Sequence, residues 1–299
     1  MTVVSRFQRG FSLLEAVIVI VITGVMLAAV ALFLRWPFQS YMDTSRRAQM
    51  TDTVDTALRR IGRDLHISLP NSVRVAGATP LQTCVEMLPT ITGGRYRAVT
   101  DNNGNGNILD FTVADGSFDM FGQFPAAQMP GAGNQVVVYN LGPSSPGADA
   151  YAANNTAAIL SVAAEPSPQV HSETLITLQA AKLFPLASPG NRFQVIGPNN
   201  NAAVSYVCTA TAVNAQGAGT GTLKRVTGYV TTAAQVCPPA GGTSTPLANN
   251  VSNCSFQYTV PQSLTNAPAR EGLLQMRLGV TQGNETVNLY HEVHINNAP

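Results

Sequence analysis

The sequence predicts an α+β protein in which one long N-terminal helix packs on an antiparallel β-sheet domain. Helical patterning runs from residue 11 to residue 68, and beyond it short β-type runs are separated by Gly, Pro and Asn clusters. No helical pattern separates these runs, which argues against a parallel sheet. Because 45% of the 299 residues are hydrophobic and only 11% are charged, the chain can bury a sizeable core and differs from disordered proteins.

The start of the helix is long and apolar enough to cross a membrane. Ala16–Leu34 contains no charged residue, and Phe11–Leu34 spans roughly 36 Å as a helix, against a hydrocarbon core of about 30 Å. The leader before it carries Arg6 and Arg9 and no acid, so the positive-inside rule places the leader in the cytoplasm. A cleaved secretory signal fits poorly, because the apolar stretch is too long and no Ala-x-Ala site follows it.

Glu15 is the only charged residue between Phe11 and Leu34. A carboxylate costs about 2.5–3.5 kcal/mol at the centre of a membrane helix, so such a residue is a candidate functional site. The alternative is a position near the cytoplasmic interface, where the cost is small.

The residues around Glu15 favour the functional alternative. Arg9–Glu15 has the sequence RGFSLLE and is followed at once by the apolar helix. This order of basic leader, Gly, Phe, three residues, Glu and apolar run resembles the prepilin leader and cleavage motif of type IV pilins and type II secretion pseudopilins. The resemblance implies the type IV pilin-like fold.

The resemblance also implies roles for three residues. Gly10 would be the last residue removed by a prepilin peptidase at the inner membrane, and Phe11 would become the N-methylated N-terminus. Glu15 would pair with the terminal ammonium of a neighbouring subunit. Among apolar helices an unpaired charge is very costly, so the pair would set the alignment of the subunits.

Strings further along the chain are similar to the O proteins of mannose-sensitive haemagglutinin (MSHA) pilus biogenesis, which are minor, pilin-like members of type IV pilus operons. These strings are Leu69–Val75, Gly93–Ala98, Asn253–Tyr258 and Leu289–Asn297. They cover short patches of the chain, whereas the leader motif indicates the wider pilin-like family.

The expected organisation has four parts. Residues 1–10 form the leader, 11–34 the transmembrane part of the helix, 35–68 its periplasmic amphipathic part, and 69–299 a β-rich globular head. In the amphipathic part the apolar positions recur at helical spacing and predict a stripe that docks on the sheet. The stripe consists of Val54, Leu58, Ile61 and Leu65. Pro37 is expected to bend or locally open the helix, and Pro70 to end it by about Ser68.

The head is expected to contain ten short strands. They are Cys84–Leu88, Arg95–Thr100, Gln135–Asn140, Thr174–Leu178, Arg192–Ile196, Val204–Cys208, Thr222–Val230, Ser255–Val260, Leu273–Thr281 and Thr286–Ile295. A short connection around Gly283 predicts that the last two form a hairpin. Low-complexity segments are expected to be exposed loops. They are Asp101–Asn107, Gly142–Asn155, Asn199–Ala203, Asn214–Gly221 and Pro238–Asn250.

The four cysteines are disulfide candidates, because a periplasmic location permits oxidation. They are Cys84, Cys208, Cys237 and Cys254. Sequence alone allows three connectivities. An expected hairpin between Cys208 and Cys237 weakly favours that pair, which leaves Cys84 with Cys254. No Cys-x-x-Cys spacing supports zinc.

Metal binding is not expected at the histidines. An offset of three on a strand places His291 and His294 on opposite faces, so that they do not share one ion. His66 and His171 have no neighbouring partner in the sequence.

The segment from Asp101 matches the first half of a calcium-binding loop. Asp101, Asn103 and Asn105 supply oxygens at positions one, three and five, and a glycine follows at position six. Position twelve is Thr112 rather than the bidentate acid that such a loop needs. The segment therefore predicts a polar turn, with calcium as a weak alternative.

Composition and motifs exclude several functions. The chain has 17 basic and 16 acidic residues, without the basic excess of nucleic-acid-binding proteins. It lacks the nucleophile elbow, phosphate loop and zinc protease motifs, so no enzyme activity and no cofactor are expected.

The function expected from the resemblance is structural. It is that of a minor pilin that helps to initiate or cap a type IV pilus, held by a single span in a bacterial inner membrane with its head in the periplasm or at the pilus tip. Other pilins, prepilin peptidase and the inner-membrane assembly platform would be its partners. Cleavage would leave 289 of 299 residues, which is large for a major pilin, and a bulky head would be awkward to repeat along a shaft. The alternatives are a J-type pseudopilin of type II secretion and a binding protein such as an adhesin.

Overall fold

The structure is a computed structural model that describes residues 10, 12–79, 82–143, 145, 147–164, 172–198, 201–209, 212–260 and 271–299. The chain divides into two compact units, residues 1–49 and residues 50–299. The first unit contains the N-terminal part of the long helix, and the second contains the rest of the helix and all the strands.

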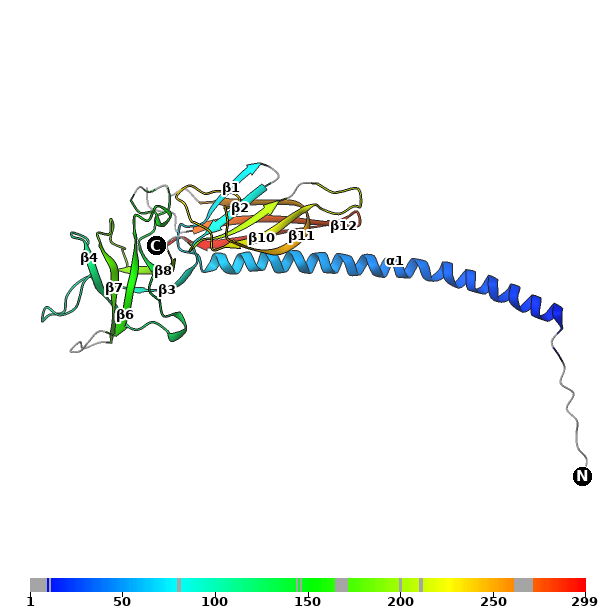
Figure 1. The fold of residues 1–299 in the computed structure, drawn as a ribbon, viewed down its shortest axis with the longest axis horizontal. Helices are drawn as coiled ribbons and strands as arrows, with labels where there is room; N and C mark the ends of the chain where they lie inside the picture. The colour runs from blue at the N-terminus through cyan, green and yellow to red at the C-terminus, as the bar shows by residue number, and fades with distance from the viewer. Residues whose placement is uncertain are drawn as a thin grey trace, which may run out of the picture. The chain divides into compact units, whose positions relative to one another are not determined.

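Helix α1 comprises Leu13–His66 (Figure 1). Its ends lie within two residues of the expected positions, and Phe11 lies outside the described residues. The helix runs unbroken through Pro37, so the expected local opening is wrong. A proline removes only one backbone donor, and the hydrogen bonds of the neighbouring turns keep the helix continuous.

The C-terminal part of α1 packs on the first of two sheets, in the second unit. The predicted stripe is confirmed, since Val54, Leu58, Ile61 and Leu65 are each at most 2% exposed. Fully burying each of these side chains contributes about 1.5–3 kcal/mol, which explains why this part of the helix is fixed to the sheet.

The two sheets are antiparallel throughout, as expected for the fold class. The larger sheet has the strand order β1-β2-β9-β10-β11-β12-β13. Its strands are β1 (Arg74–Thr79), β2 (Gln82–Met87), β9 (Val204–Thr209), β10 (Gly221–Thr227), β11 (Thr243–Thr259), β12 (Glu271–Gln282) and β13 (Glu285–Asn296). The smaller sheet has the order β3-β8-β5-β6-β7-β4. Its strands are β3 (Thr90–Arg95), β4 (Asp115–Phe121), β5 (Asn134–Val138), β6 (Thr156–Ala164), β7 (Glu173–Lys182) and β8 (Arg192–Pro198).

Several strand predictions need correction. Strands β1, β4 and β6 were not expected, and the strand predicted at Arg95–Thr100 is wrong because β3 ends where that strand was to begin. The loop predicted at Pro238–Asn250 is also wrong, since it contains the first half of β11, which pairs with β10. Gly142–Asn155 is not simply exposed, because Ala148, Ala150 and Tyr151 are buried within it.

The predicted hairpin is confirmed at Gly283 and Asn284. The partners Gln282 and Glu285 leave a two-residue turn in which both residues have positive φ, 61° and 63°. Such a turn matches the right-handed twist of the strands it joins.

The described residues of the second unit form three apolar clusters. One lies between α1 and the larger sheet, and another lies within the smaller sheet. The third is built around Leu69, Leu88, Val137, Ile196 and Tyr229 and brings together residues of both sheets. The larger sheet is therefore covered by apolar contacts on both faces.

The turn after α1 is tied to the last residues of the chain. Asn71 has φ 59°, and its Nδ2 donates to the carbonyl oxygens of Asn140 at 2.9 Å and Asn297 at 3.1 Å. Asn297 Oδ1 accepts from the backbone N–H of Asn71, and its Nδ2 donates to the hydroxyl of Tyr258. Three of the four MSHA-like strings thus meet at one place in the fold.

Candidate functional site: the N-terminal helix and the head

The first turn of α1 contains a capping interaction that the sequence analysis did not identify. The backbone N–H of Glu15 donates to Ser12 Oγ at 3.2 Å and to Ser12 O at 3.1 Å. Ser-x-x-Glu is a capping-box pattern, so the signal was present in the sequence. The carboxylate of Glu15 makes no hydrogen bond or ion pair within the described part of the chain, and it lies beside the favourable N-terminal end of the helix dipole.

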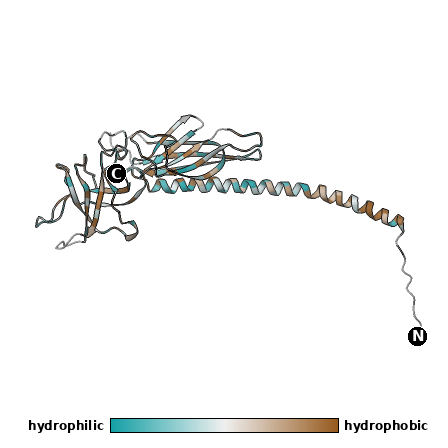
Figure 2. Ribbon diagram, in the orientation of Figure 1, coloured by the Kyte–Doolittle hydropathy of each residue, from teal (hydrophilic) through white to brown (hydrophobic). Residues whose placement is uncertain are grey.

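The turns that follow expose an apolar surface on all sides. Figure 2 shows this end of α1 as the most hydrophobic part of the helix. Leu13 and Phe33 are more than 80% exposed, and no residue of the most apolar window of the helix is buried. Thr23 donates back to the carbonyl oxygen of Val19 at 2.6 Å, so its hydroxyl has a partner within the helix. Among the described residues α1 is the one helix long and apolar enough to cross a membrane, and it fits a membrane anchor.

All four cysteines form disulfides, but the weakly favoured pairing is wrong. The bonds join Cys84 to Cys237 and Cys208 to Cys254. Strands β9 and β10 do form a hairpin, yet β10 ends at Thr227, ten residues before Cys237. The faces of the larger sheet decide the pairing, because Cys208 and Cys254 belong to the cluster beneath α1 while Cys84 and Cys237 contact the cluster on the other face.

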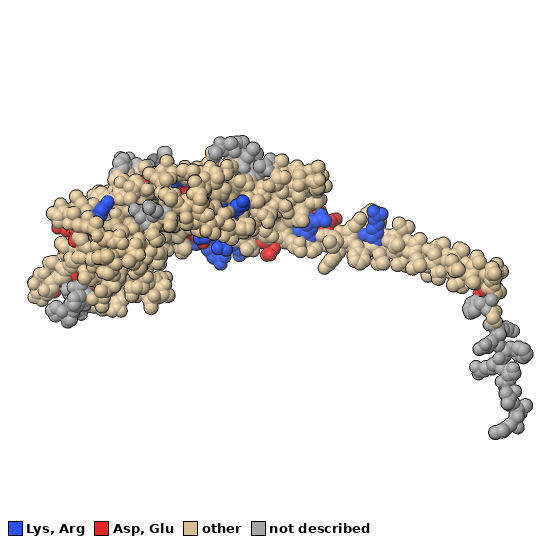
Figure 3. All heavy atoms as spheres, viewed as in Figure 1, with Lys and Arg blue, Asp and Glu red and all other residues tan. Residues whose placement is uncertain are grey.

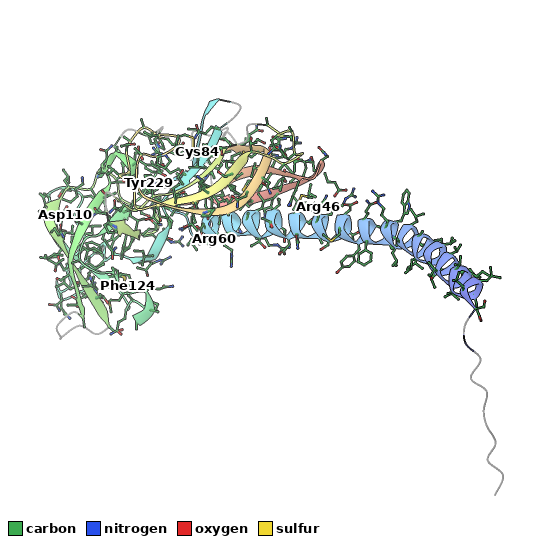
Figure 4. All side chains as sticks on the ribbon, turned by 45° about the vertical axis from the view of Figure 1, so that its right-hand side comes forward. Arg46, Arg60, Cys84, Asp110, Phe124 and Tyr229 are labelled. Atoms are coloured by element: carbon green, nitrogen blue, oxygen red, sulfur yellow. A yellow bond between two sulfur atoms is a disulfide. The ribbon has the colours of Figure 1, made fainter. Side chains whose placement is uncertain are left out.

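A buried ion pair anchors the segment that carries Cys237. Arg74 Nε donates to Glu86 Oε1 at 2.8 Å, and its terminal nitrogens donate to the carbonyl oxygens of Thr232 and Ala233. The hydroxyl of Tyr229 donates to Glu86 Oε2 at 3.0 Å. Figure 4 labels Tyr229 and Cys84 in this region of the head. Burial, followed by the charge of Glu86, raises the pKa of Tyr229, so its hydroxyl stays a donor at neutral pH.

A second buried charge cluster lies in the smaller sheet. The guanidinium of Arg97 donates to both carboxylate oxygens of Glu173, and Asp119 Oδ2 is 4.0 Å from Arg97 Nε. All three side chains are less than 10% exposed. Since a buried charge is costly unless it is paired, these residues hold β4 and β7 to the segment after β3.

The candidate calcium segment is folded as a polar turn. Asp101 Oδ1 accepts from the backbone N–H groups of Asn103 at 2.8 Å and Asn105 at 2.7 Å. These hydrogen bonds lower the pKa of Asp101. Asp110 accepts from Thr112, at the place where a calcium loop needs an acid. Among the described residues no group of three His, Cys, Asp or Glu side chains has the arrangement of a metal site.

The histidines are gathered in a way that their sequence positions do not predict. His66, His291 and His294 line one groove of about 740 Å³ between α1 and β13. His171 lies outside the described residues. The groove is also lined by Thr56, Arg59, Gly62, Arg63, Glu292 and Val293.

The comparisons with known proteins identify the N-terminal motif. The family model for the prokaryotic N-terminal methylation motif matches residues 5–31. No curated protein and no solved structure matches the chain significantly. The match covers the leader and the first part of the exposed apolar helix.

The motif, the apolar helix and the antiparallel sheets together support a type IV pilin- or pseudopilin-like subunit. Proteins of this class are structural subunits rather than enzymes. The motif implies processing by prepilin peptidase and assembly with other pilins.

Proposed function

We propose that the chain is a minor pilin-like subunit of a type IV pilus of the MSHA type, and that it helps to initiate or cap the filament. The observation that carries this proposal is the position of the methylation motif, which runs directly into an apolar helix with no buried residue in its most apolar window. An apolar surface of this kind needs a bilayer or other apolar helices around it.

In this proposal prepilin peptidase cleaves between Gly10 and Phe11, and Phe11 becomes the N-methylated N-terminus. Glu15 then pairs with the terminal ammonium of a neighbouring subunit. Support comes from the carboxylate of Glu15, which has no partner within the described residues and is followed by a helix without charge as far as Leu34. A subunit inserted out of register leaves both charges unpaired, which makes the pair an alignment device.

The assignment to the MSHA type rests on the four downstream strings. Support comes from their place in the fold, since residues of three of them form the hydrogen-bonded junction of Asn71, Tyr258 and Asn297. Residues in such a junction are constrained by their hydrogen-bond partners, so likeness at these positions supports the proposal more than likeness in exposed loops does.

A position at the filament tip is supported by the size of the head. The described residues after the helix form two sheets with thirteen strands, and a subunit of this bulk is easier to place once than to repeat along a shaft. The head would lie in the periplasm before assembly. The net charge of +1 gives no support for a nucleic-acid partner.

N-terminal sequencing of the protein isolated from its host tests the proposal. The expected result is a chain that begins with methylated phenylalanine at position 11 and is recovered with pilus subunits. A chain that begins at Met1 and never associates with a fibre contradicts the proposal. Recovery with type II secretion pseudopilins would assign the chain to that machinery instead.

A further inference from the structure

Strand β13 differs from the other edge strands of the two sheets. The described strands leave four edges, at β1, β13, β3 and β4. The edge strands β1, β3 and β4 have six or seven residues, and each shows a register shift against its neighbour. By contrast β13 has 12 residues and pairs with β12 without a shift along its whole length.

A long, regular edge strand is a template for another strand. Its outer row of backbone N–H and C=O groups is unpaired, and natural proteins usually blunt such an edge with a bulge, a proline or a lysine. Strand β13 contains no proline and no lysine, and its acidic residues are Glu285 and Glu292. Within the described residues no strand pairs with its outer edge.

The helix side of this edge is basic. Arg59, Arg63 and His66 of α1 line the groove beside β13, at the three- and four-residue spacing that places them on one face of the helix. Figure 3 shows basic atoms gathered on the C-terminal turns of α1. Arg59 Nε is bonded to Asp55 at 2.7 Å, whereas Arg63 has no ion pair within the described part of the chain.

Glu292 is the one acid among the described residues that line the groove, and it lies on the strand side. Val293 and Ile295 are buried beneath α1, so alternation places His291 on the helix-facing side. A Cβ added at Gly62 would lie 3.8 Å from His291 Nε2, which confirms the close approach. Glu292 has the opposite parity, and its carboxylate accepts from Gln275 Nε2 at 2.9 Å and from the Tyr290 hydroxyl.

We propose that this groove receives an extended acidic segment of a neighbouring subunit, which adds to β13 as a further strand. Alternate side chains of the added strand would face α1, so carboxylates at every second position would meet Arg59 and Arg63. The distance from Thr56 to His66 is about 15 Å along the helix, which corresponds to roughly four or five residues of a strand. This length allows two or three carboxylates to face the basic row.

A peptide fits the groove better than a polyphosphate chain does. An unpaired strand edge offers alternating donors and acceptors, which another backbone satisfies and a phosphate polymer does not. The inference rests on the proposed function only in naming a filament subunit as the source of the segment.

Peptide binding to the full-length chain in detergent micelles tests the inference. The probe is a fluorescein-labelled peptide of about nine residues with Glu or Asp at every second position and Thr or Val between them, followed by fluorescence anisotropy. We expect saturable binding that weakens as the salt concentration rises, because salt screens the attraction between exposed charges. Replacing the acids by glutamine, or N-methylating alternate backbone nitrogens, should each weaken binding about tenfold or more.

Protein variants locate the site. The double variant Arg59→Glu and Arg63→Glu should weaken binding about tenfold or more, whereas Arg60→Glu should leave it nearly unchanged. Arg60 is a matched control, since it is exposed but does not line the groove. Figure 4 labels it on the same helix.

Four results would overturn the inference. Two concern the peptide: the glutamine peptide, or the N-methylated peptide, binds as tightly as the acidic peptide. In the third, the acidic peptide does not bind, but polyphosphate binds and the double arginine variant abolishes this binding, which would assign the groove to a phosphate polymer. In the fourth, the chain forms a dimer that the double variant dissociates, which would assign the groove to a second copy of this chain. This experiment needs neither leader cleavage nor a pilus, so its failure is distinguishable from failure of the proposed function.

Discussion

The hydroxyl of Tyr206 donates a hydrogen bond of 2.7 Å to Asp64 Oδ2, although 142 residues separate them. The same oxygen accepts from Arg225 Nε at 2.9 Å. Through these two hydrogen bonds Asp64 joins the last turns of α1 to β9, which contains Tyr206, and to β10, which contains Arg225. They lie beside the apolar stripe of α1 that packs on the same sheet. Burial, followed by the hydrogen bond to Asp64, raises the pKa of Tyr206, so the hydroxyl keeps its proton at neutral pH.

Removing this hydrogen bond should loosen the helix from the sheet. Tyr206→Phe is expected to lower the free energy of unfolding by about 1–3 kcal/mol, because the acceptor is charged. A double-mutant cycle with Asp64→Asn, measured by urea unfolding of the full chain in detergent, should give a coupling energy of about 1 kcal/mol. Asp52→Asn, at an exposed position of the same helix, should change stability by less than about 0.5 kcal/mol. Strictly additive effects at residues 64 and 206 would contradict the contact.

Asn71 is expected to combine two separate contributions to stability. Asn71→Gly keeps the positive φ without strain but loses two side-chain hydrogen bonds, which should cost about 1–3 kcal/mol. Asn71→Ala should cost about 1–2 kcal/mol more, because an alanine is strained in the left-handed region. Thermal unfolding of both variants, followed by near-UV circular dichroism, measures the difference. Equal stabilities of the two variants would show that the backbone strain is absent.

The buried Arg97 should be needed for the smaller sheet. Arg97→Met leaves Glu173 and Asp119 buried without their cationic partner, and breaking such a pair typically costs about 3–5 kcal/mol. Arg95→Met is the control, since Arg95 is exposed two residues earlier. Urea unfolding should show a large decrease in the free energy of unfolding for Arg97→Met and little change for Arg95→Met. A variant at residue 97 as stable as the parent chain would mean that the cluster contributes nothing.

Peptide mapping without reduction should recover the two disulfides as Cys84–Cys237 and Cys208–Cys254. These bonds close loops of 153 and 46 residues, so chain entropy predicts about 5 and 4 kcal/mol of stabilisation for them. Reduction of both disulfides should therefore lower the urea concentration at the unfolding midpoint sharply. The double variant Cys84→Ala and Cys237→Ala, which lacks one disulfide, should lower it by a smaller amount. Recovery of a Cys208–Cys237 peptide would contradict the assignment of these two cysteines to opposite faces of the larger sheet.

Glu15→Ala should separate membrane insertion from assembly. The variant removes a charge from an apolar helix, so it should insert at least as well as the parent chain. Recovery with partner pilins should fall strongly, because in the proposed pairing the terminal ammonium of the neighbouring subunit would lose its counter-charge. Immunoblots of membrane and sheared-pilus fractions measure both effects. As a control, replacing Gly10 should block leader cleavage. Normal recovery in pili of the Glu15→Ala variant would show that the carboxylate does not align the subunit.

Local patterns predicted the parts of the fold that local physics determines. The helix, its buried stripe and the turn at Gly283 follow from periodicity and turn chemistry, and all three are confirmed. Strand β6 escaped prediction because its sequence, TAAILSVAA, is rich in alanine and lacks regular alternation. It forms because β5 and β7 pair with it.

Long-range contacts were beyond prediction for a different reason. Nothing near Arg97 in the sequence indicates that Glu173, 76 residues away, completes its ion pair. The disulfide pairing depends on which face of the sheet each cysteine occupies, and a register shift of one residue reverses that face. The groove at His66 is likewise a product of tertiary packing, since its other side comes from β13.

Ser12 lies on the mature side of the proposed scissile bond. Cutting after Gly10 would leave Ser12 as the second residue of the shortened chain, still bonded to the N–H of Glu15. The cap of the first turn would therefore survive the proposed cleavage, which would remove ten residues without removing this hydrogen bond.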